Sequence, residues 1–431
     1  MNYQNNKATD IQITYIGGGS RGWAWAFMTD LALDETMSGT IRLYDIDLEA
    51  AGNNKIIGNR ISDRPDAVGK WNYEIYSDLN KALEGADFVV ISILPGTFDE
   101  MEVDVHLPER LGVYQPVGDT VGPGGMMRAL RTIPMFAHLA KSIKQSAPNA
   151  WVINYTNPMS ICVQTLYDTF PEIKAFGCCH EVFGTQELLK KMVEEKFGLN
   201  DIVRSDIKVN VLGINHFTWF DYASYKGIDL FPLYDEFVEA NYERGYGEEN
   251  EHWANSYFTS NQRVKFDLFK RFGYIAAAGD RHLAEFMPGS EYLNCPATVK
   301  HWGFALTPVS WRKTDLEGRM ARGNRLANAE EEVKLTPTGE EGILLIKALC
   351  GLEAITSNVI IPNTNRQITN LPITAIVESN AVFERDSIRP VIAGEMPENI
   401  KTLTMPHIEN MEYIMEASKT LNKELIVKAF L

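Results

Sequence analysis

The chain has 431 residues, of which 45% are hydrophobic and 23% are charged, a composition typical of soluble globular proteins and a length sufficient for two domains. Its formal net charge of −16 argues against nucleic acid or an anionic membrane as a partner. An anionic substrate would therefore need a local cluster of cationic side chains.

Cysteine usage and the N-terminus indicate the compartment. The five cysteines are odd in number and scattered, at Cys162, Cys178, Cys179, Cys295 and Cys350. This pattern is not a disulfide framework. The first residues are polar and lack the apolar core of a signal peptide, and no stretch approaches the run of about 18 apolar residues that a membrane span needs. We expect a cytoplasmic protein with reduced thiols and no membrane partner.

A glycine motif follows the first predicted strand. Residues 11–16 are rich in β-formers, residues 17–22 read Gly-Gly-Gly-Ser-Arg-Gly, and residues 23–33 continue as an apolar helix. A second predicted strand at residues 40–44 ends at Asp45. Strand, G-x-G-x-x-G, helix, strand and acid in this order are typical of a dinucleotide-binding unit. A glycine-rich structural turn is the alternative.

The motif assigns the cofactor contacts. We expect the pyrophosphate to meet the helix N-terminus along the backbone of Gly17, Gly19, Ser20 and Gly22. Asp45 would accept a hydrogen bond from a ribose hydroxyl, and an acid there favours NAD over NADP because it repels a 2′-phosphate. We also place Glu109 in the cofactor site.

Alternating elements continue after the motif. Residues 86–93 and 151–155 are apolar runs typical of strands, each preceded by a helical stretch, and this alternation predicts a parallel, doubly wound sheet. Between them, residues 109–125 are so rich in Gly and Pro that we expect backbone closing over a ligand, with a plain flexible loop as the alternative. Residues 126–145 predict a long helix that Pro134 kinks or breaks.

The strand at residues 151–155 leads to Asn157 and Pro158. Pro158 holds the preceding residue extended and suits the first turn of a helix. Because sites of parallel sheets form at the carboxyl ends of strands, the Asn157 amide can contact sugar hydroxyls or the nicotinamide. Capping of the following helix is the alternative.

Reactive side chains converge on the turn between a strand predicted at residues 173–176 and a helix predicted at residues 184–197. This turn holds Cys179, His180 and Glu181 in succession. A thiolate with an imidazole suits a borderline-soft divalent metal, with a partner ligand from elsewhere in the fold. The alternative is a buried pair of small cysteines with His and Glu on the surface.

Two histidine-containing segments follow in the second half. Residues 207–214 alternate and predict a strand that leads to His216, a candidate second metal ligand. A helix predicted at residues 266–272 leads through small residues to Asp280-Arg281-His282. This trio suits a pocket wall with a base, a cation and a hydrogen bonder, and a solvated surface trio is the alternative.

The C-terminal part predicts further regular elements. Residues 310–334 indicate a charged helix, residues 373–378 a strand, and residues 405–429 a final amphipathic helix. Thr338 and Glu341 have the spacing of a capping box for the intervening helix. No internal repeat or linker is visible, so we expect the second half to pack on the first.

Taken together, the motifs resemble glycoside hydrolase family 4, the NAD- and metal-dependent glycosidases, over nearly the whole chain. The resemblance rests on residues 17–22, Gln115-x-x-Gly118-Asp119 with Gly124-Gly125, Asn157-Pro158, the Cys179-His180-Glu181-Val182 quartet, Asn215-His216 and residues 363–372. The Cys-His-Glu-Val form is similar to the α-galacturonidase branch. Members acting on phosphorylated sugars carry Asp or Asn where His180 stands, so the resemblance disfavours a 6-phospho-glycoside.

The resemblance and the order of elements imply an α/β protein with the two-domain architecture of lactate and malate dehydrogenases. Residues 1–200 would form an NAD-binding Rossmann domain with a doubly wound parallel sheet. Residues 201–431 would form an α+β domain that binds substrate, completes the metal site and supports a homodimer or homotetramer.

The resemblance implies hydrolysis of α-galacturonides or related α-uronides. In the family's reaction NAD⁺ oxidises sugar C3, a base removes the C2 proton, and a divalent metal holds the charge of the enediolate. The glycosidic oxygen then leaves, water adds and NADH returns the hydride. α-Glucuronides, α-glucosides and α-galactosides are alternative substrates. An NAD-dependent sugar or 2-hydroxyacid dehydrogenase and a non-catalytic dinucleotide sensor are alternative functions.

The resemblance also implies which residues bind metal and substrate. It assigns Cys179 and His216 to a divalent metal, with Mn²⁺ as the usual ion. Asn157 and Glu181 would contact the substrate, the small oligosaccharide or uronide. Arg281 would form a bidentate pair with a uronate carboxylate.

Proton transfer is assigned in the same way. Asp280 is the expected base at C2, and Tyr274 is its competitor because other members use a tyrosine. His180 is the expected acid for the leaving group, with Glu181 as the alternative.

Overall fold

Parallel strands with helices on both faces make up the N-terminal half of the protein. The computed structural model describes residues 1–247, 256–258 and 260–430. Parallel strands lie in the order β4-β3-β2-β5-β6-β7. They are β2 (Lys7–Ile16), β3 (Met37–Tyr44), β4 (Lys70–Tyr76), β5 (Phe88–Ile91), β6 (Trp151–Asn154) and β7 (Lys174–Gly177). This is the strand order of dinucleotide-binding folds, and the predicted Rossmann sheet is confirmed.

Helices bury both faces of this sheet. Residues of α1 and α2 pack on one face, and residues of α3, α5 and α6 pack on the other. All of β5 is buried, as expected for a strand covered on both sides. The helices of this half are α1 (Trp23–Leu33), α2 (Leu48–Asp63), α3 (Leu79–Leu83), α4 (Phe98–His106), α5 (Gly122–Ser146) and α6 (Met159–Thr169).

The sheet continues into antiparallel strands of the C-terminal half. Ile360 of β12 pairs with Gly177 of β7, and β13, β8, β9 and β10 follow in that order. These and the short flanking strands are β8 (Ile207–Ile214), β9 (Phe217–Tyr225), β10 (Ile228–Asp229), β11 (Ile275–Ala276), β12 (Ile355–Pro362), β13 (Ile376–Glu384), β14 (Ser387–Pro390) and β1 (Asn2–Gln4). The predicted α+β character of this half is confirmed.

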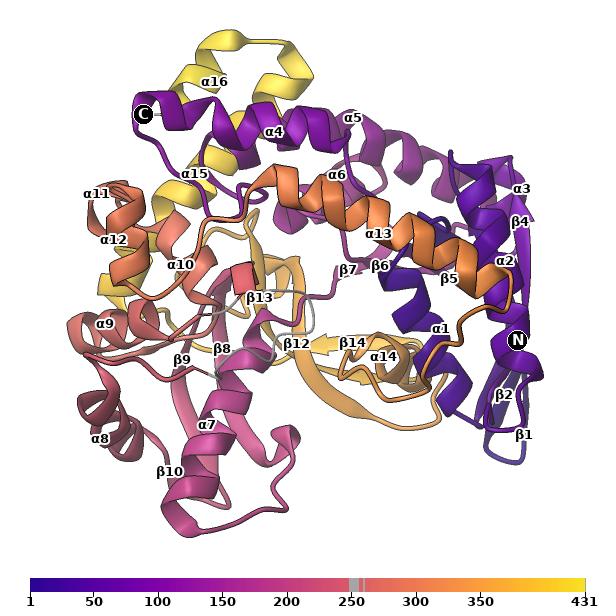
Figure 1. The fold of residues 1–431 in the computed structure, drawn as a ribbon, viewed down its shortest axis with the longest axis horizontal. Coiled ribbons are helices and arrows are strands. Elements are labelled where there is room, and N and C mark those ends of the chain that lie inside the picture. The colour runs from indigo at the N-terminus through magenta and orange to yellow at the C-terminus, as the bar shows by residue number, and fades with distance from the viewer. Residues whose placement is uncertain (248–255, 259, 431) are drawn as a thin grey trace.

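Helices of the C-terminal half reach back over the N-terminal half. Helix α13 (Val309–Ala327) lies beside α2 (Figure 1), and Arg60 Nη1 donates to Leu326 O at 3.1 Å. Helix α14 (Gly342–Leu349) shares its core with α1. The division into residues 1–200 and 201–431 stays a prediction. The other helices are α7 (Glu181–Phe197), α8 (Phe231–Asn241), α9 (Arg263–Phe272), α10 (Asp280–Phe286), α11 (Gly289–Tyr292), α12 (Pro296–His301), α15 (Glu398–Thr420) and α16 (Lys423–Phe430).

Several predicted helices have different bounds. The final helix predicted at residues 405–429 is two helices, α15 and α16, because Leu421 takes a left-handed φ of 56° between them. Helix α5 begins within the expected loop at residues 109–125 and continues through Pro134. The helix predicted at residues 310–334 ends at Ala327.

The predicted capping box before α14 is wrong. Glu341 immediately precedes the helix, so it cannot serve as the third helical residue of such a box. The Thr338 backbone N–H instead donates to Asp30 Oδ1 of α1 at 3.0 Å. A tertiary contact has replaced the local one.

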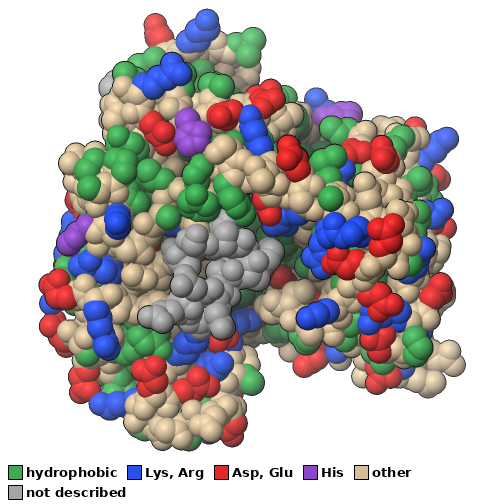
Figure 2. All heavy atoms as spheres, viewed as in Figure 1, with side chains coloured by type: hydrophobic (Ala, Val, Ile, Leu, Met, Phe, Trp, Pro, Cys, Tyr) green, Lys and Arg blue, Asp and Glu red, His purple; other side chains and the backbone are tan. Residues whose placement is uncertain are grey.

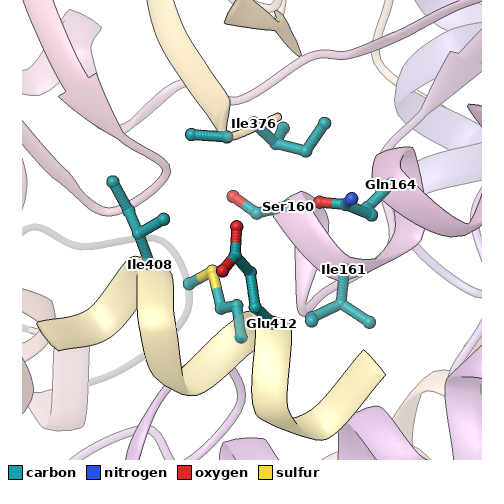
Figure 3. Close-up of a pocket in the computed structure, with 8 residues that line it drawn as sticks. Ser160, Ile161, Gln164, Ile376, Ile408 and Glu412 are labelled. Atoms are coloured by element: carbon teal, nitrogen blue, oxygen red, sulfur yellow. The ribbon is translucent and has the colours of Figure 1, made fainter. Parts of the chain in front are cut away.

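The molecular surface carries both signs of charge, and a small pocket lies beside α15. Acidic and basic side chains are interspersed over the face in Figure 2. Where α15 packs near α6, Ser160 and Glu412 point into a pocket otherwise lined mainly by apolar side chains (Figure 3). No helix among the described residues is long and apolar enough to span a membrane.

Candidate active site

A hairpin turn places His216 at the centre of the site. Strands β8 and β9 pair Ile214 with Phe217, so Asn215 and His216 form a two-residue turn. His216 adopts a left-handed φ of 66°. Strand β11 pairs with β9, and the Ala277 N–H donates to Thr218 O at 2.7 Å, which brings the start of α10 beside this turn.

Three side chains from separate segments converge there. Ligand atoms of Asp119, His216 and His282 all lie within 4.8 Å of one another. Thr120 Oγ1 bridges two of them, lying 2.8 Å from Asp119 Oδ1 and 2.9 Å from His216 Nδ1. Two imidazoles with one carboxylate suit a divalent first-row metal with open coordination positions.

The protonation of the cluster suits a cation. Burial lowers the pKa of His216 to about 3, so the ring is in its neutral, ligating form. Burial opposes ionisation of Asp119, but His282, His216 and Arg128 together hold its pKa below the usual range. The buried His282 Nδ1 has no hydrogen-bond partner among the described residues. An unpartnered ring nitrogen beside a carboxylate fits a metal ligand.

The predicted ligand Cys179 lies next to this cluster but is not part of it. Its backbone carbonyl accepts a hydrogen bond from Asn358 Nδ2 at 3.1 Å, and its thiol is hydrogen-bonded to Asn215, the neighbour of His216. Burial raises the pKa of the Cys179 thiol, and the charges of Glu378 and Glu181 raise it further. Metal ligation by Cys179 stays a prediction.

Glu181 joins the Cys-His-Glu turn to the second half of the chain. Its Oε2 accepts from the Gly279 N–H at 2.7 Å, and its Oε1 lies 3.8 Å from His282 Nε2. Burial alone would raise the pKa of Glu181, but neighbouring histidines, His282 first, lower it to about 2. Glu181 is therefore a carboxylate at the edge of the metal cluster.

His180 faces the dinucleotide loop. Its ring stacks on Trp23, the first residue of α1, with ring centroids 5.8 Å apart, and Trp23 in turn stacks on Tyr155. His180 Nδ1 lies 3.1 Å from Glu340 Oε1, and 47% of the side chain is exposed. Although burial alone would lower the pKa of His180, Glu340 and then Glu181 raise it to about 9. The ring thus carries a proton close to solvent.

Neither predicted base is a member of the metal cluster. The buried carboxylate of Asp280 accepts from the Val264 N–H at 3.3 Å and the Lys265 N–H at 3.1 Å, at the N-terminus of α9. Because β11 pairs Ile275 with Phe220, Tyr274 lies at the end of that strand away from His216. A role for either residue as the base stays a prediction.

The glycine loop has the geometry of a dinucleotide cradle. Gly17 has a φ of 95°, and a Cβ there would lie 2.0 Å from Ser92 O. The Gly19 N–H donates to Asp45 Oδ2 at 2.7 Å, and the Ser20 N–H donates to Gly17 O at 2.9 Å. Gly22 is the N-cap of α1. A close-packed loop that opens onto a helix N-terminus fits a pyrophosphate.

Two further predicted residues have defined partners. Glu109 Oε1 lies 3.0 Å from His106 Nδ1, and its cofactor contact stays a prediction. Asn157 precedes a cis peptide bond to Pro158, and its side chain donates to Asp119 Oδ2 at 3.2 Å instead of capping α6. The buried Asn157 Oδ1 has no partner in the part of the chain that the structure describes, so it is available to a ligand.

Arg281 points between two loops. Its Nη2 donates to Pro116 O at 2.8 Å and to Thr307 Oγ1, while its buried Nε has no partner within the described residues. Nearby, Glu285 Oε1 accepts from the Val117 N–H at 2.7 Å. Substrate binding by Arg281 stays a prediction.

Sequence reasoning did not assign Asp119 or His282 to the metal, and it did not assign Glu340 to the site. Asp119 and His282 both lie in motifs that the sequence shows. Asp119 belongs to the glycine-rich motif at 115–125, and His282 belongs to the trio at 280–282. Their convergence depends on tertiary packing of loops. No local pattern marks Glu340, which lies in the segment before α14.

Family comparisons cover almost the whole chain. Residues 12–195 match the family described as family 4 glycosyl hydrolase, and residues 211–431 match the family 4 glycosyl hydrolase C-terminal domain. An alpha-galacturonidase of Lachnoclostridium phytofermentans is 68% identical over 430 residues, covering 100% of this chain and 92% of the relative. An alpha-galacturonidase of Bacillus subtilis is 53% identical over 421 residues, covering 98% and 92%.

Solved structures share the fold. A putative glucosidase, lplD, from Bacillus subtilis has a TM-score of 0.93 at 52% identity, covering 98% of this chain and 95% of that one. A 6-phospho-alpha-glucosidase from gut microorganisms, in complex with NAD and Mn²⁺, has a TM-score of 0.79 at 20% identity, covering 98% and 93%. A malate dehydrogenase from Naegleria fowleri, at a TM-score of 0.52 and 12% identity over 95% and 98% of the two chains, supports the predicted dehydrogenase-like architecture.

Proposed function

Because this chain belongs to family 4 of the glycosyl hydrolases, we propose that it hydrolyses α-galacturonides with NAD and a divalent metal, Mn²⁺, as cofactors. Relatives at 68% and 53% identity are named alpha-galacturonidases. A protein of the same fold was crystallised with NAD and Mn²⁺. The substrate is a small oligosaccharide or uronide with an α-linked uronic acid.

The observation that carries the proposal is the contact between the cofactor loop and the metal side of the site. Trp23 follows the glycine loop directly and stacks on His180, the neighbour of Cys179. A dinucleotide on the loop and a metal at Asp119 and His216 would therefore serve one sugar. When bound, NAD supplies reversible hydride transfer at C3, and the metal supplies a Lewis acid for charge that develops after C2 deprotonation.

Protein groups position the sugar in this scheme. Asp119, His216 and His282 would hold the metal, and the Cys179 thiol would join them on losing its proton. Asn157, fixed by its hydrogen bond to Asp119, presents its free Oδ1 to a sugar hydroxyl.

Proton transfer uses groups on either side of the sugar. His180, oriented by Glu340 and Trp23, donates its proton to the glycosidic oxygen as the bond breaks. Glu181 holds the Gly279 backbone against this turn. We keep Asp280 as the proposed base and Tyr274 as its competitor.

The proposal is tested by assaying p-nitrophenyl α-D-galacturonide with NAD⁺, Mn²⁺ and reductant. We expect hydrolysis that stops when either cofactor is removed and returns when it is restored. A C2-deuterated substrate should react more slowly because the C2 proton is removed. Full activity after removal of both cofactors would refute the proposal.

The same assay separates the hydrolase from a dehydrogenase on this fold. A hydrolase returns its hydride in each cycle, so NADH, followed by its absorbance, should not accumulate at steady state. A sugar or 2-hydroxyacid dehydrogenase would accumulate NADH in proportion to product. The metal-suited cluster favours the hydrolase, because hydride transfer of the malate dehydrogenase type needs no such ligand set.

We also propose that the enzyme acts in the cytoplasm as a homodimer or homotetramer. The five cysteines are all free thiols, which suits a reducing compartment. Size-exclusion chromatography with light scattering measures the assembly, and a monomer at micromolar concentration would contradict it.

A further inference from the structure

Cationic side chains surround the metal cluster of this otherwise acidic protein. With a formal net charge of −16, the chain can attract an anionic substrate only through a local group of this kind. The arginines concerned lie on three helices: Arg128 on α5, Arg281 on α10 and Arg312 on α13. Arg128 interacts electrostatically with Asp119, and so does Arg312. Both arginines therefore lie on the Asp119 side of the site.

Arg281 and Arg312 share one aromatic platform. The guanidinium carbon of Arg281 lies 4.8 Å from the centroid of the Phe258 ring, and that of Arg312 lies 5.8 Å from the same centroid. Two like charges over one ring repel each other, and the repulsion contributes to a lowered pKa of Arg281 after burial. An anion between them would relieve that repulsion.

The two arginines differ in how they are held. Arg281 is 8% exposed and is fixed by the Pro116 carbonyl and the Thr307 hydroxyl. The buried Nε of Arg312 has no hydrogen-bond partner, and none of its nitrogens lies within ion-pair distance of a carboxylate among the described residues. Arg281 is thus positioned by the protein, whereas Arg312 has no acceptor among the described residues.

Other arginines of α13 show that this is unusual for the helix. Arg319 pairs with Asp315 at 2.6 Å, and Arg322 pairs with Glu331 at 2.7 Å. Arg325 pairs with the same Glu331 at 3.0 Å. A partly buried guanidinium without an acceptor is costly unless a ligand completes it. Arg312 therefore has the features of a ligand-binding residue.

We propose that Arg312, with Arg281 beside it, binds the carboxylate of the uronide substrate. This inference rests on the proposed α-galacturonidase function and adds the residue that selects an acidic over a neutral sugar. The planar fork of a guanidinium matches the two oxygens of a carboxylate. The carboxylate on C5 is separate from the C2 and C3 hydroxyls that would face the metal, so it needs a cation that lies in the same site but is not itself a metal ligand. Arg312, which interacts with the charge of Asp119, is such a cation.

The test compares wild type with Arg312→Leu on p-nitrophenyl α-D-galacturonide and p-nitrophenyl α-D-galactoside, with NAD⁺ and Mn²⁺ present. Loss of a buried charged partner should lower kcat/KM for the galacturonide by about 100-fold or more. The galactoside, which lacks the carboxylate, should lose less than about threefold. Arg322→Leu on the same helix is the matched control and should leave both values unchanged.

Arg312→Lys distinguishes loss of carboxylate binding from a folding defect. It keeps the charge but loses the fork, so it should raise KM for the galacturonide alone, with an unchanged melting temperature. Equal losses on both substrates, or no loss on either, would overturn the inference. So would faster cleavage of a 6-phosphogalactoside than of the galacturonide, since the anion recognised would then be a phosphate.

Failure of the inference is distinguishable from failure of the proposed function. If wild type cleaves the galacturonide and Arg312→Leu does so equally well, the inference falls and the function stands. If wild type cleaves only neutral α-glycosides, the proposed substrate is wrong and the carboxylate role of Arg312 falls with it.

Discussion

The imidazole rings of His216 and His282 lie face to face, with centroids 3.8 Å apart and ring planes inclined by 30°. Two imidazolium ions would repel each other strongly at this distance in a buried site. Burial lowers the pKa of His216 to about 3, so at least this ring is neutral. The pair, together with Asp119, is arranged to share one cation.

His282→Gln should weaken Mn²⁺ binding by about tenfold to 100-fold, because it removes one of the clustered ligand nitrogens. Isothermal titration with Mn²⁺ measures the affinity. His301→Gln, at an exposed position on α12, is the control and should bind Mn²⁺ as wild type does. Unchanged affinity in His282→Gln would exclude His282 as a ligand.

Cys179→Ser should remove a thiolate from the metal. We expect cobalt-loaded wild type to show a near-ultraviolet thiolate-to-metal charge-transfer band, and Cys179→Ser to lack it. Cys178→Ser is the matched control, because Cys178 is buried against the N-terminal core. A band that persists in Cys179→Ser would assign the thiolate to another cysteine, and absence of the band in wild type would leave the metal to Asp119, His216 and His282 alone.

Glu340→Gln should impair protonation of the leaving group, because Glu340 orients the His180 ring. We expect kcat to fall by about tenfold to 100-fold for an alkyl α-galacturonide, whose leaving group needs a proton. The p-nitrophenyl substrate should lose much less. Glu332→Gln, at a side chain that is 84% exposed, is the control. Equal losses on both substrates would argue against an acid at this position.

Gly19→Ala should reduce NAD⁺ affinity at least about tenfold, a loss of ~1.4 kcal/mol. The added Cβ would lie 2.8 Å from Ala50 Cβ and 3.0 Å from Asp45 Oδ2. Fluorescence titration with NAD⁺ measures the effect. Gly52→Ala in α2 is the control, since nothing lies within 4 Å of its added Cβ, and it should retain affinity.

Asp280→Ala should destabilise the protein by about 1–3 kcal/mol, because buried N–H groups at the start of α9 lose their acceptor. Denaturant unfolding measures this loss, with Asp235→Asn on the exposed side of α8 as the control. If Asp280 is also the base, residual turnover should keep its C2-deuterium isotope effect while kcat falls. Wild-type kcat in a folded Asp280→Ala protein would remove Asp280 from the reaction.

The N-terminal sheet was predictable because its signals are local. The motif at residues 17–22 combines strand, turn and helix in one contiguous stretch, and α1 has the predicted bounds of residues 23–33. Strand β4 gave no such signal, because its outward-facing residues are polar and only Trp71 and Tyr73 are buried.

The metal cluster was only partly predictable because its members come from distant loops. His216 was identified through its neighbours in sequence, whereas Asp119 and His282 become ligand candidates only when the chain brings them within 4.8 Å. The capping box at Thr338 failed for the same reason: its tertiary partner, Asp30, is remote in sequence.

Helix α14 has a consequence for how the protein can be divided. Ile343, Leu345 and Ile346 pack into the same core as Trp25 and Met28 of α1. A fragment cut at residue 200 would leave these α1 side chains facing water and would tend to self-associate. The nucleotide-binding segment therefore does not form a self-contained unit. Grafting it onto another protein would also require helix α14, which lies some 140 residues further along the chain.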